Sequence, residues 1–252
     1  MNSLLFDPEF SIVDESEDWV IANKPAHLLS HPNKPGNPPT LLDGLEGLYA
    51  FEIANGAQLS VITRLDRDTS GLVLLAKHPE AARTLSLAIQ SGAIHKEYLA
   101  IVWGWPEEDE WQVDAPILRL GEVEPASIWL KRGVHPAGKP SQTRFRVESR
   151  FERETSNGRQ FSLIRAFPLT GRMHQIRIHL AHSGFPIVGD KIYGPDEKCY
   201  LEFIETGWTT KLADQLLLDR HALHAHTLRY QKGTWTAPLH PDMEGFVGLD
   251  YR

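Results

Sequence analysis

The sequence lacks several features that would place it in particular classes of protein. Its 252 residues include a single cysteine, Cys199, so no internal disulfide can form. It has no run of roughly 18 or more apolar residues, and we therefore expect no membrane-spanning helix. The segment Met1–Glu9 has no basic residue and carries two acids, which does not fit a secretory signal peptide. A cytoplasmic protein is the simplest expectation.

The chain also lacks an excess of positive charge. Its net charge is −7 and its pI is about 5.9, so a nucleic-acid partner would need a local basic surface. Residues 142–182 contain eight arginines against three glutamates, whereas residues 1–50 contain two lysines against eight acids. The charge is therefore segregated along the chain. An ordinary solvated surface would give the same pattern, so charge alone leaves both interpretations open.

No internal repeat or low-complexity tract is present, and 41% of the residues are hydrophobic, enough for one large domain or two small ones. Strand patterns outnumber helical patterns without alternating strictly with them, which favours an α+β fold with a largely antiparallel or mixed sheet. Strands are expected at 19–23, 71–76, 96–103 and on both sides of Asn157-Gly158, a strong hairpin signal. Helices are expected at 41–50, 79–90, 171–182 and near 212–218, and turns, short strands and a tail at 229–252.

The expected helix at 171–182 would begin after Thr170 as its N-cap. Met173, Ile176 and Leu180 would form its inward face. Arg177 lies one position from this apolar stripe, so it could simply extend along the edge of the helix into water.

The segment Val61–Lys77 combines a polar turn with a buried strand. Two carboxylates, Asp66 and Asp68, alternate with two arginines immediately before an apolar run. Charged groups beside a buried strand are costly unless they are paired or have a function. A solvated turn with local side-chain caps is the alternative interpretation. For Asp68, a role in capping the turn is a better explanation than a role as a second catalytic acid.

Six segments spread from Val20 to Leu228 carry recognisable motifs. They are V-I-A-N-K-P-A-H-L-L-S-H-P at 20–32, R-L-D-R-D-T-S-G at 64–71, H-K-E-Y-L-A-I-V at 95–102, L-T-G-R-M-H-Q-I-R-I-H-L-A at 169–181, P-I-V-G-D-K-I-Y-G at 186–194 and H-A-L-H-A-H-T-L at 221–228. In this order they resemble the motifs of pseudouridine synthases of the RluA type, whose signature is R-L-D-x-x-T-S-G. Because the resemblance covers most of the chain, it is far more specific than one motif.

The resemblance implies the pseudouridine synthase fold. This is an α+β fold with a long, bent, mostly antiparallel or mixed sheet, flanking helices and loops, and a central cleft. We expect residues 1–252 to form a single catalytic domain, with 1–18 as an N-terminal extension and 229–252 as C-terminal strands and a tail. Too few residues precede Val20 for the separate N-terminal RNA-binding domain that many relatives carry.

The resemblance also implies a reaction, the isomerisation of uridine to pseudouridine in structured ribosomal or transfer RNA. The C1′–N1 bond breaks, the uracil rotates, and C5 bonds to C1′. Because no electrons are transferred overall, neither a redox cofactor nor a metal is expected. RNA is the expected partner, DNA and membranes are not, and a monomer is expected.

The resemblance assigns roles to individual residues. Asp66 matches the catalytic aspartate, Arg177 matches the basic residue that pairs with it, and Tyr98 matches the tyrosine that stacks on the target base and takes part in proton transfer. Arg64 matches an arginine that enters the RNA beside the flipped nucleotide. We expect Arg172 and Gln175 to contact phosphate or to orient the cleft.

Two positions depart from the family pattern. Thr63 stands where the family usually has histidine, which gives a hydroxyl in place of an imidazole. If that histidine helps to shape the RNA site, the choice of target RNA is expected to differ. His27 stands where the family usually has glycine, which would be unfavourable if that position requires a positive φ.

Three other functions are open at this stage. A metal-dependent hydrolase is suggested by twelve histidines, but His174 and His179 do not share a helix face, and no H-E-x-x-H motif is present. A non-catalytic RNA-binding or chaperone protein on the same fold would keep the motifs without the reaction. A two-carboxylate glycosidase would need a second acid near Asp66, and only Asp68 is close in sequence.

Overall fold

The computed structural model describes residues 10–32 and 38–248. Within these ranges the chain folds into two compact units. Unit 1 comprises the described residues up to Lys96 together with His224–His240, and unit 2 comprises Glu97–Leu223 and the described residues from Pro241 onward. The division neither confirms nor contradicts a single catalytic domain, which stays a prediction.

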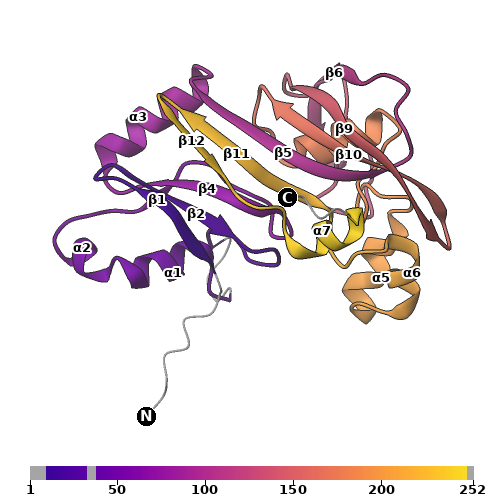
Figure 1. Cartoon of the computed structure of the whole chain (residues 1–252), viewed down its shortest axis with the longest axis horizontal. Helices are drawn as coiled ribbons and strands as arrows, with labels where there is room; N and C mark the ends of the chain where they lie inside the picture. Colours follow the sequence, from indigo (N-terminus) through magenta and orange to yellow (C-terminus); the bar gives the residue numbers. More distant parts are fainter. Residues whose placement is uncertain (1–9, 33–37, 249–252) are drawn as a thin grey trace, which may run out of the picture. The chain divides into compact units, whose positions relative to one another are not determined.

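Unit 1 is built on a mixed sheet with the strand order β1-β2-β4-β11, to which β3 and β12 add at β4 and β11 (Figure 1). Among the strand pairs of unit 1 that the structure describes, only β4–β11 is parallel. The strands are β1 (Ser11–Glu15), β2 (Trp19–Lys24), β3 (Ser60–Val61), β4 (Ser70–Ala76), β11 (Leu223–Tyr230) and β12 (Gly233–Thr236). The helices are α1 (Leu41–Leu48), α2 (Ala50–Ala54) and α3 (Pro79–Gln90).

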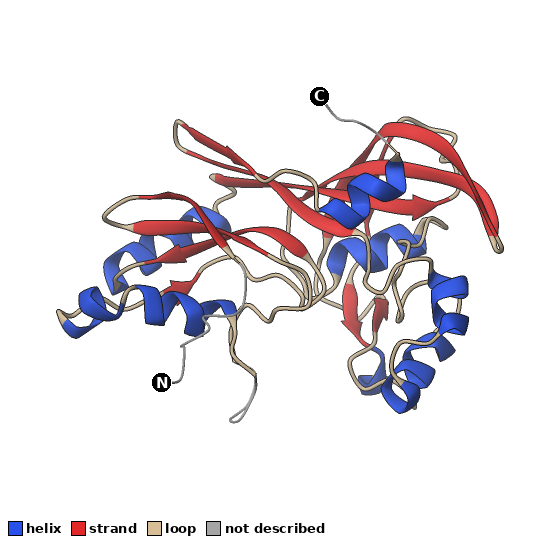
Figure 2. Ribbon diagram, turned by 60° about the horizontal axis from the view of Figure 1, so that its bottom comes forward, coloured by secondary structure: helices blue, strands red, loops and turns tan. Residues whose placement is uncertain are grey.

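Unit 2 is built on four antiparallel strands in the order β5-β10-β9-β6 and a separate β7-β8 pair. The strands are β5 (Ile94–Trp103), β6 (Glu110–Asp114), β7 (Ile117–Arg119), β8 (Arg132–Val134), β9 (Gln142–Thr155) and β10 (Gly158–Pro168). A short 3₁₀ turn spans Leu120–Glu122, and the helices are α4 (Gln175–His182), α5 (Lys198–Thr206), α6 (Thr210–Leu216) and α7 (Pro241–Val247). Figure 2 shows helices flanking the strands, and the α+β class with a mixed, mostly antiparallel sheet is confirmed.

Packing explains why the apolar runs become strands. Every residue of β4 is buried, and its alternate side chains Leu72, Leu74 and Ala76 join Ile21 of β2 and Leu85 of α3 in one hydrophobic cluster. Helix α3 begins where the sequence predicts, with Pro79 in its first turn and the ring nitrogen of His78 accepting from the Ala81 N–H at 3.2 Å. In unit 2, Ile178 of α4 packs with Ile117 and Tyr193.

Several predicted elements are confirmed. The strands at 19–23, 71–76 and 96–103 correspond to β2, β4 and β5, the helices at 41–50 and 79–90 to α1 and α3, and the Asn157-Gly158 turn joins β9 to β10. The helix expected near 212–218 is α6, displaced by two residues.

Other elements differ from the prediction. Helix α4 begins at Gln175 instead of Gly171, because His174 adopts a left-handed conformation with φ 60° that interrupts the helix at its N-terminus. Thr170 is therefore not its N-cap, and Met173 is 45% exposed instead of facing inward. The sequence analysis also missed α2, α5 and α7, and α7 replaces part of the expected tail. Each is nine residues or fewer, so its own periodicity is weak and packing decides its conformation.

Candidate active site

The loop that carries Asp66 connects β3 to β4 and is held by main-chain contacts within unit 1. The hydroxyl of Ser30 accepts from the Leu65 N–H at 3.1 Å and donates to the Leu65 carbonyl at 3.0 Å. The Asp66 carbonyl accepts from the Thr69 N–H at 3.1 Å, which closes the turn before β4. The Asp66 side chain is half-buried and Arg64 is exposed. The backbone is therefore fixed on both sides of Asp66.

A buried lysine adds a further link to this loop. Lys24, at the end of β2, is fully buried, and its Nζ donates to the carbonyls of Pro25 (2.8 Å), Leu28 (2.7 Å) and Arg67 (3.1 Å). One ammonium group thus binds the K-P-A-H-L turn to the residue after Asp66. Sequence analysis gave Lys24 no role, although it stands in the K-P motif.

The structure shows the conformation and contacts of His27 and Thr63, the two residues that depart from the family pattern. His27 has φ 64°, so the position that is usually glycine does adopt a left-handed conformation. Its carbonyl accepts from Arg67 Nε at 3.2 Å, and its Nδ1 lies 3.4 Å from the Asp68 carboxylate. Thr63 is buried, and its hydroxyl accepts from the Leu74 N–H on β4 at 2.8 Å. The hydroxyl at position 63 therefore supports the strand that follows the loop.

Tyr98 lies on β5 in unit 2, opposite Ala166 of β10, and is 9% exposed. The sequence H-K-E-Y places Lys96 two residues earlier, and burial lowers the pKa of the Lys96 ammonium below its usual value. Glu97, between them, pairs with Arg165 of β10 at 2.9 Å. The predicted contribution of Tyr98 to base stacking stays a prediction.

Arg177 lies on α4 and is 5% exposed, so it does not extend into water along a helix edge. Its Nε lies 2.6 Å and its Nη2 2.9 Å from the two carboxylate oxygens of Asp190, which is fully buried. The Tyr193 ring faces the guanidinium at 5.0 Å from its centroid. Asp190 was missed by the sequence analysis, although its G-D-K-I-Y-G motif was recognised. The pairing of Arg177 with Asp66 is untested and stays a prediction.

The turn before α4 is organised by Gln175. Its Oε1 accepts from the Thr170 hydroxyl (2.7 Å) and the Arg172 N–H (2.9 Å), and its Nε2 donates to the Gln142 carbonyl and the Thr143 hydroxyl, both at 2.9 Å. Gln175 is 4% exposed, which does not fit a direct phosphate contact and fits a residue that orients the turn. Arg172 is exposed, and its Nε donates a hydrogen bond to the Pro140 carbonyl at 3.1 Å.

A sequence profile of the RNA pseudouridylate synthase family matches residues 18–182, more than half of the chain. The chain belongs to this family. Its members are isomerases that modify RNA. The motifs at Asp66, Tyr98 and Arg177 all fall within the matched range.

Named relatives agree with this assignment. The chain is 36% identical to the dual-specificity RNA pseudouridine synthase RluA of Vibrio parahaemolyticus, over 79% of this chain and 75% of that protein. It is also 36% identical to the ribosomal large subunit pseudouridine synthase D of Escherichia coli K12, over 94% of this chain and 70% of that protein. The human RNA pseudouridylate synthase domain containing 4 shares the fold with a TM-score of 0.68 at 22% identity, over 92% of this chain and 89% of that one.

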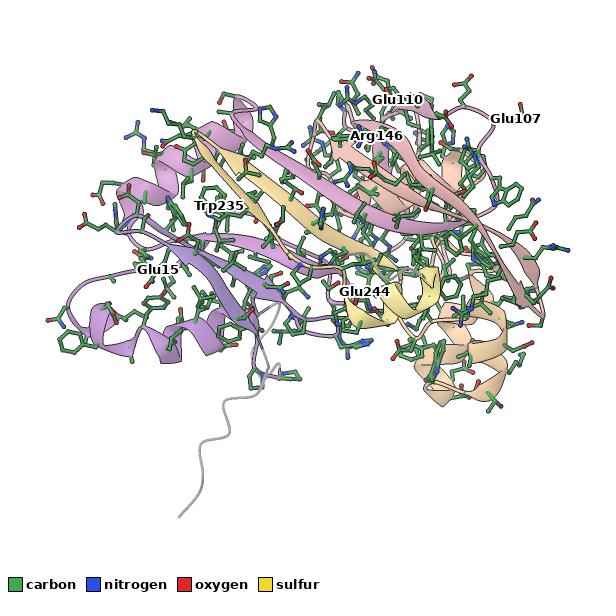
Figure 3. All side chains as sticks on the ribbon, in the orientation of Figure 1. Glu15, Glu107, Glu110, Arg146, Trp235 and Glu244 are labelled. Carbon is green, nitrogen blue, oxygen red and sulfur yellow. The ribbon has the colours of Figure 1, made fainter. Side chains whose placement is uncertain are left out.

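In this pseudouridine synthase the arginine-rich stretch 142–182 is less basic than its sequence suggests. Five of its eight arginines form ion pairs with acids: Arg146 and Arg165 with Glu148, Arg150 with Asp109, Arg159 with Glu152, and Arg177 with Asp190. Arg146, labelled in Figure 3, lies on β9 opposite Glu110 of β6. Within the described residues, Arg144, Arg153 and Arg172 have no acidic partner.

The histidines have hydrogen-bonding roles. His179 is fully buried, with Nδ1 2.9 Å from the Thr143 hydroxyl and Nε2 3.0 Å from the Ala115 carbonyl. His174 Nδ1 lies 2.8 Å from the Tyr193 hydroxyl. Over residues 10–32 and 38–248, no group of three or more His, Cys, Asp or Glu side chains is arranged to hold a metal. No helix in the same ranges is long and apolar enough to cross a membrane.

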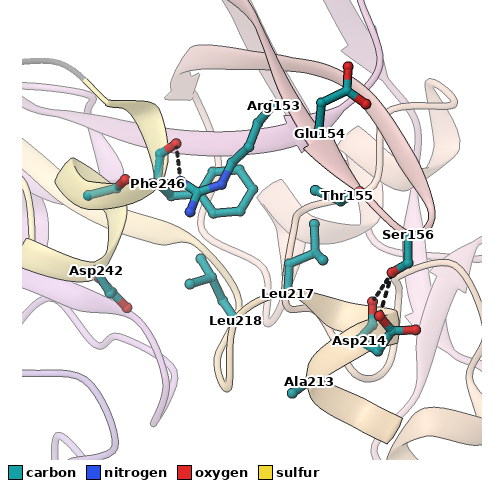
Figure 4. A pocket seen from close by; sticks show the side chains of 11 residues that line it. Arg153, Glu154, Thr155, Ser156, Ala213, Asp214, Leu217, Leu218, Asp242 and Phe246 are labelled. Atoms are coloured by element: carbon teal, nitrogen blue, oxygen red, sulfur yellow. Dashed lines mark hydrogen bonds between the residues drawn. The ribbon is translucent and has the colours of Figure 1, made fainter. Parts of the chain in front are cut away.

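A pocket of about 380 Å³ lies in unit 2, between the end of β9 and helices α6 and α7 (Figure 4). Arg153 donates to the Phe246 carbonyl at 2.9 Å, and the Ser156 hydroxyl donates to the Asp214 carboxylate at 2.5 Å. None of the predicted site residues lines this pocket.

Proposed function

We propose that this protein isomerises specific uridines of structured RNA to pseudouridine, with Asp66 acting on the flipped nucleotide. The observation that carries the proposal is a family match over 18–182 in a chain that has Asp66, Tyr98 and Arg177 at the motif positions. Two relatives are named for dual-specificity and ribosomal large subunit pseudouridine synthesis, so we propose ribosomal or transfer RNA as the substrate.

The reaction requires a carboxylate and a base removed from its stack. The C1′–N1 bond breaks, the uracil turns, and C5 bonds to C1′, while C5 loses a proton and N1 gains one. The Asp66 carboxylate acts at the sugar or the base, as nucleophile or as general base. The target nucleotide must leave the stack for this to happen, which costs a few kcal/mol. The rigid backbone on both sides of Asp66 supports the role, because it holds the carboxylate in one place.

The remaining residues supply binding and charge. Tyr98 offers an aromatic face, and stacking of a base on such a face contributes about 1–3 kcal/mol. Arg177 supplies the positive charge that is proposed to keep the Asp66 carboxylate ionised. Arg64 is exposed beside Asp66, as an arginine that enters the RNA must be. Arg172 is exposed and contacts phosphate, whereas Gln175 acts by orienting the turn that carries Arg172.

The test is tritium release from RNA labelled at C5 of uridine, with ribosomal and transfer RNA transcripts assayed separately. We expect release from at least one transcript and a loss of about 10²–10⁴-fold in Asp66→Asn. Asp68→Asn is the matched control, since Asp68 lies in the same loop and pairs with His27. Its release rate should stay close to that of the wild type.

Two outcomes would contradict the proposal. Equal release by Asp66→Asn and the wild type would remove Asp66 from the reaction. Tight RNA binding without release from either transcript would favour a non-catalytic RNA-binding protein. RNA affinity should also fall as salt rises, because phosphate contacts release counterions. Of the eight arginines in the described stretch 142–182, only Arg144, Arg153 and Arg172 have no acidic partner, so we expect the contribution of this stretch to the salt dependence to be moderate.

A further inference from the structure

Two exposed arginines flank Asp66 in the loop between β3 and β4. Arg64 and Arg67 are exposed, whereas the carboxylates of Asp66 and Asp68 are half-buried. Within residues 10–32 and 38–248, no ion pair joins either arginine to an acid. The exposed charge of this loop is therefore positive, although the protein as a whole has a net charge of −7. The proposed function uses Arg64 and gives Arg67 no role.

Arg67 is anchored at two points although its side chain is exposed. Its carbonyl accepts from the buried Nζ of Lys24 at 3.1 Å, and its Nε donates to the His27 carbonyl at 3.2 Å. Both anchors belong to the turn after β2. A guanidinium has five N–H donors, so four of them, on Nη1 and Nη2, lie beyond these contacts. Neither of these two groups has a partner in the part of the chain that the structure describes.

The acid that is nearest to Arg67 in the chain faces a different group. Asp68 follows Arg67 directly, yet its Oδ1 lies 3.4 Å from Nδ1 of His27. The exposed fractions of the His27 and Asp68 side chains are 45% and 24%. One residue thus contacts both neighbours, since the carbonyl of His27 accepts from Arg67 and its imidazole faces Asp68. The imidazole occupies the carboxylate that would otherwise be the local countercharge of Arg67.

The backbone of His27 is strained in this position. Its φ of 64° lies in the left-handed region, which glycine adopts freely and residues with a Cβ adopt rarely. Residues in such conformations persist only where the surrounding structure holds them, and they concentrate at ligand-binding sites. Glycine would keep the carbonyl that Arg67 uses, because the carbonyl belongs to the main chain. What the histidine adds is therefore the imidazole beside Asp68.

The donors of Arg67 fit a phosphate group. The planar fork of a guanidinium binds two oxygens of one phosphate, which a point charge such as lysine does not do. A guanidinium that is already anchored also loses less conformational freedom when it binds a ligand. Because Arg67 follows Asp66 directly, a phosphate bound there would belong to the same stretch of RNA as the nucleotide that meets Asp66.

Resting on the proposed function, we infer that Arg67 binds a backbone phosphate beside the flipped nucleotide, and that the His27 imidazole keeps Asp68 from neutralising it. Asp68 itself does not contact the RNA, so its replacement should leave binding and release unchanged. Arg67 contributes to affinity and not to the chemical step, so its loss should raise KM and leave kcat as it is. Together with Arg64, it would hold the RNA on both sides of Asp66.

The test of Arg67 is the salt dependence of RNA binding by Arg67→Gln. Binding of the ribosomal and transfer RNA transcripts is measured from about 50 to 200 mM salt, and we expect the slope of log Kd against log salt to fall by about 0.7–0.9. At about 0.1 M salt the Kd should rise by about three- to tenfold, with kcat changed less than about twofold. Arg67→Lys keeps the charge and should keep the slope.

Arg83→Gln is the matched control, since Arg83 is an exposed arginine of α3 and the change removes the same charge. Its slope should equal that of the wild type. An unchanged slope in Arg67→Gln, or an equal decrease in Arg83→Gln, overturns the proposal. A loss of kcat in Arg67→Gln without a change in slope also overturns it, because that result would assign the arginine to holding the loop.

His27 is tested by a double-mutant cycle with Asp68. His27→Ala removes the imidazole and keeps both the Cβ and the carbonyl, so we expect the Kd for RNA to rise by about two- to fivefold. In the Asp68→Asn background the same change should alter the Kd by less than about 1.5-fold, because no acid is left to neutralise Arg67. An equal loss in both backgrounds overturns the role of His27.

The binding and release assays separate this inference from the proposed function. RNA binding with the expected slopes but without tritium release overturns the proposed function and supports the phosphate contact. Tritium release with a slope that Arg67→Gln leaves unchanged overturns the phosphate contact alone. Absence of both binding and release in the wild type overturns both.

Discussion

The loop that carries Asp66 and the helix that carries Arg177 are held in opposite ways. In unit 1 the loop is fixed through its backbone, by Ser30 on Leu65 and by Lys24 on the Arg67 carbonyl, while Arg64 is exposed. In unit 2 the side chain itself is locked, because Arg177 is bonded to a fully buried carboxylate. The difference teaches that an exposed residue can be positioned through its main chain, whereas a buried charged residue is positioned through its functional group.

Breaking the locked pair should have the largest effect on stability. Arg177→Gln leaves Asp190 buried without its countercharge, which we expect to lower the free energy of unfolding by about 3–5 kcal/mol. Urea denaturation measures this. The double variant Arg177→Gln/Asp190→Asn should recover much of the loss, because it buries two neutral amides. Arg146→Gln, which removes a half-exposed pair with Glu148, should cost at most about 1 kcal/mol. Equal losses for Arg177→Gln and Arg146→Gln would contradict the comparison.

Removing the main-chain link in unit 1 should have the next largest effect. Lys24→Met keeps the apolar stem and removes the donor from three carbonyls, so we expect a loss of at least about 2 kcal/mol in unfolding free energy. Tritium release should fall as well, since the residue after Asp66 loses its contact. Lys77→Met is the control, because Lys77 forms a surface pair with Glu15 and should cost less than about 1 kcal/mol. A stable Lys24→Met variant would show that the loop does not depend on the buried ammonium.

The left-handed residue His27, in the turn after β2, should give a smaller change in stability, of opposite sign. His27→Gly removes the Cβ at φ 64° and should raise the stability by up to about 1 kcal/mol. His27→Ala is the matched control, since it also loses the contact with Asp68 but keeps the Cβ. We expect the glycine variant to be the more stable of the two in urea denaturation. Equal stability would mean that the conformation at position 27 carries no strain.

The smallest effect should come from the buried histidine of α4. Burial lowers the pKa of His179, so the folded state keeps the neutral ring while the unfolded state, with a pKa near 6.5, takes up a proton. Stability should therefore be complete above about pH 6.5 and fall as the pH drops below it. His179→Gln should flatten this fall in urea midpoints measured from pH 8 to pH 5.5. His95→Gln, at an exposed position, should keep the wild-type pH dependence.

Part of the fold and site could be predicted because the signals are local. Pro79 and the apolar spacing after it define α3, Asn157-Gly158 defines the β9–β10 turn, and the apolar run before Lys77 defines β4. The motif strings nominated Asp66, Tyr98 and Arg177 together. The start of α4 could not be predicted, because it depends on the left-handed conformation of His174, which no neighbouring residue indicates.

The partners of charged residues could not be predicted, because they come from distant parts of the chain. Glu97 and Asp109 lie outside the arginine-rich stretch and neutralise Arg165 and Arg150. A count of charges within 142–182 therefore overstated the basic surface. Gln175 shows the same limitation, since a polar residue beside Arg172 gave no sign that four hydrogen bonds would bury it.

The sequence by itself determined the family, the α+β class and the order of the motifs, because strand and helix periods and the motif strings are properties of neighbouring residues. Only the tertiary structure decided that Lys24 binds the Asp66 loop and that Asp190 holds Arg177. The physical reason is burial. Removing a charge from water forces it to find a partner wherever the fold brings one, and that partner is set by packing rather than by position in the chain.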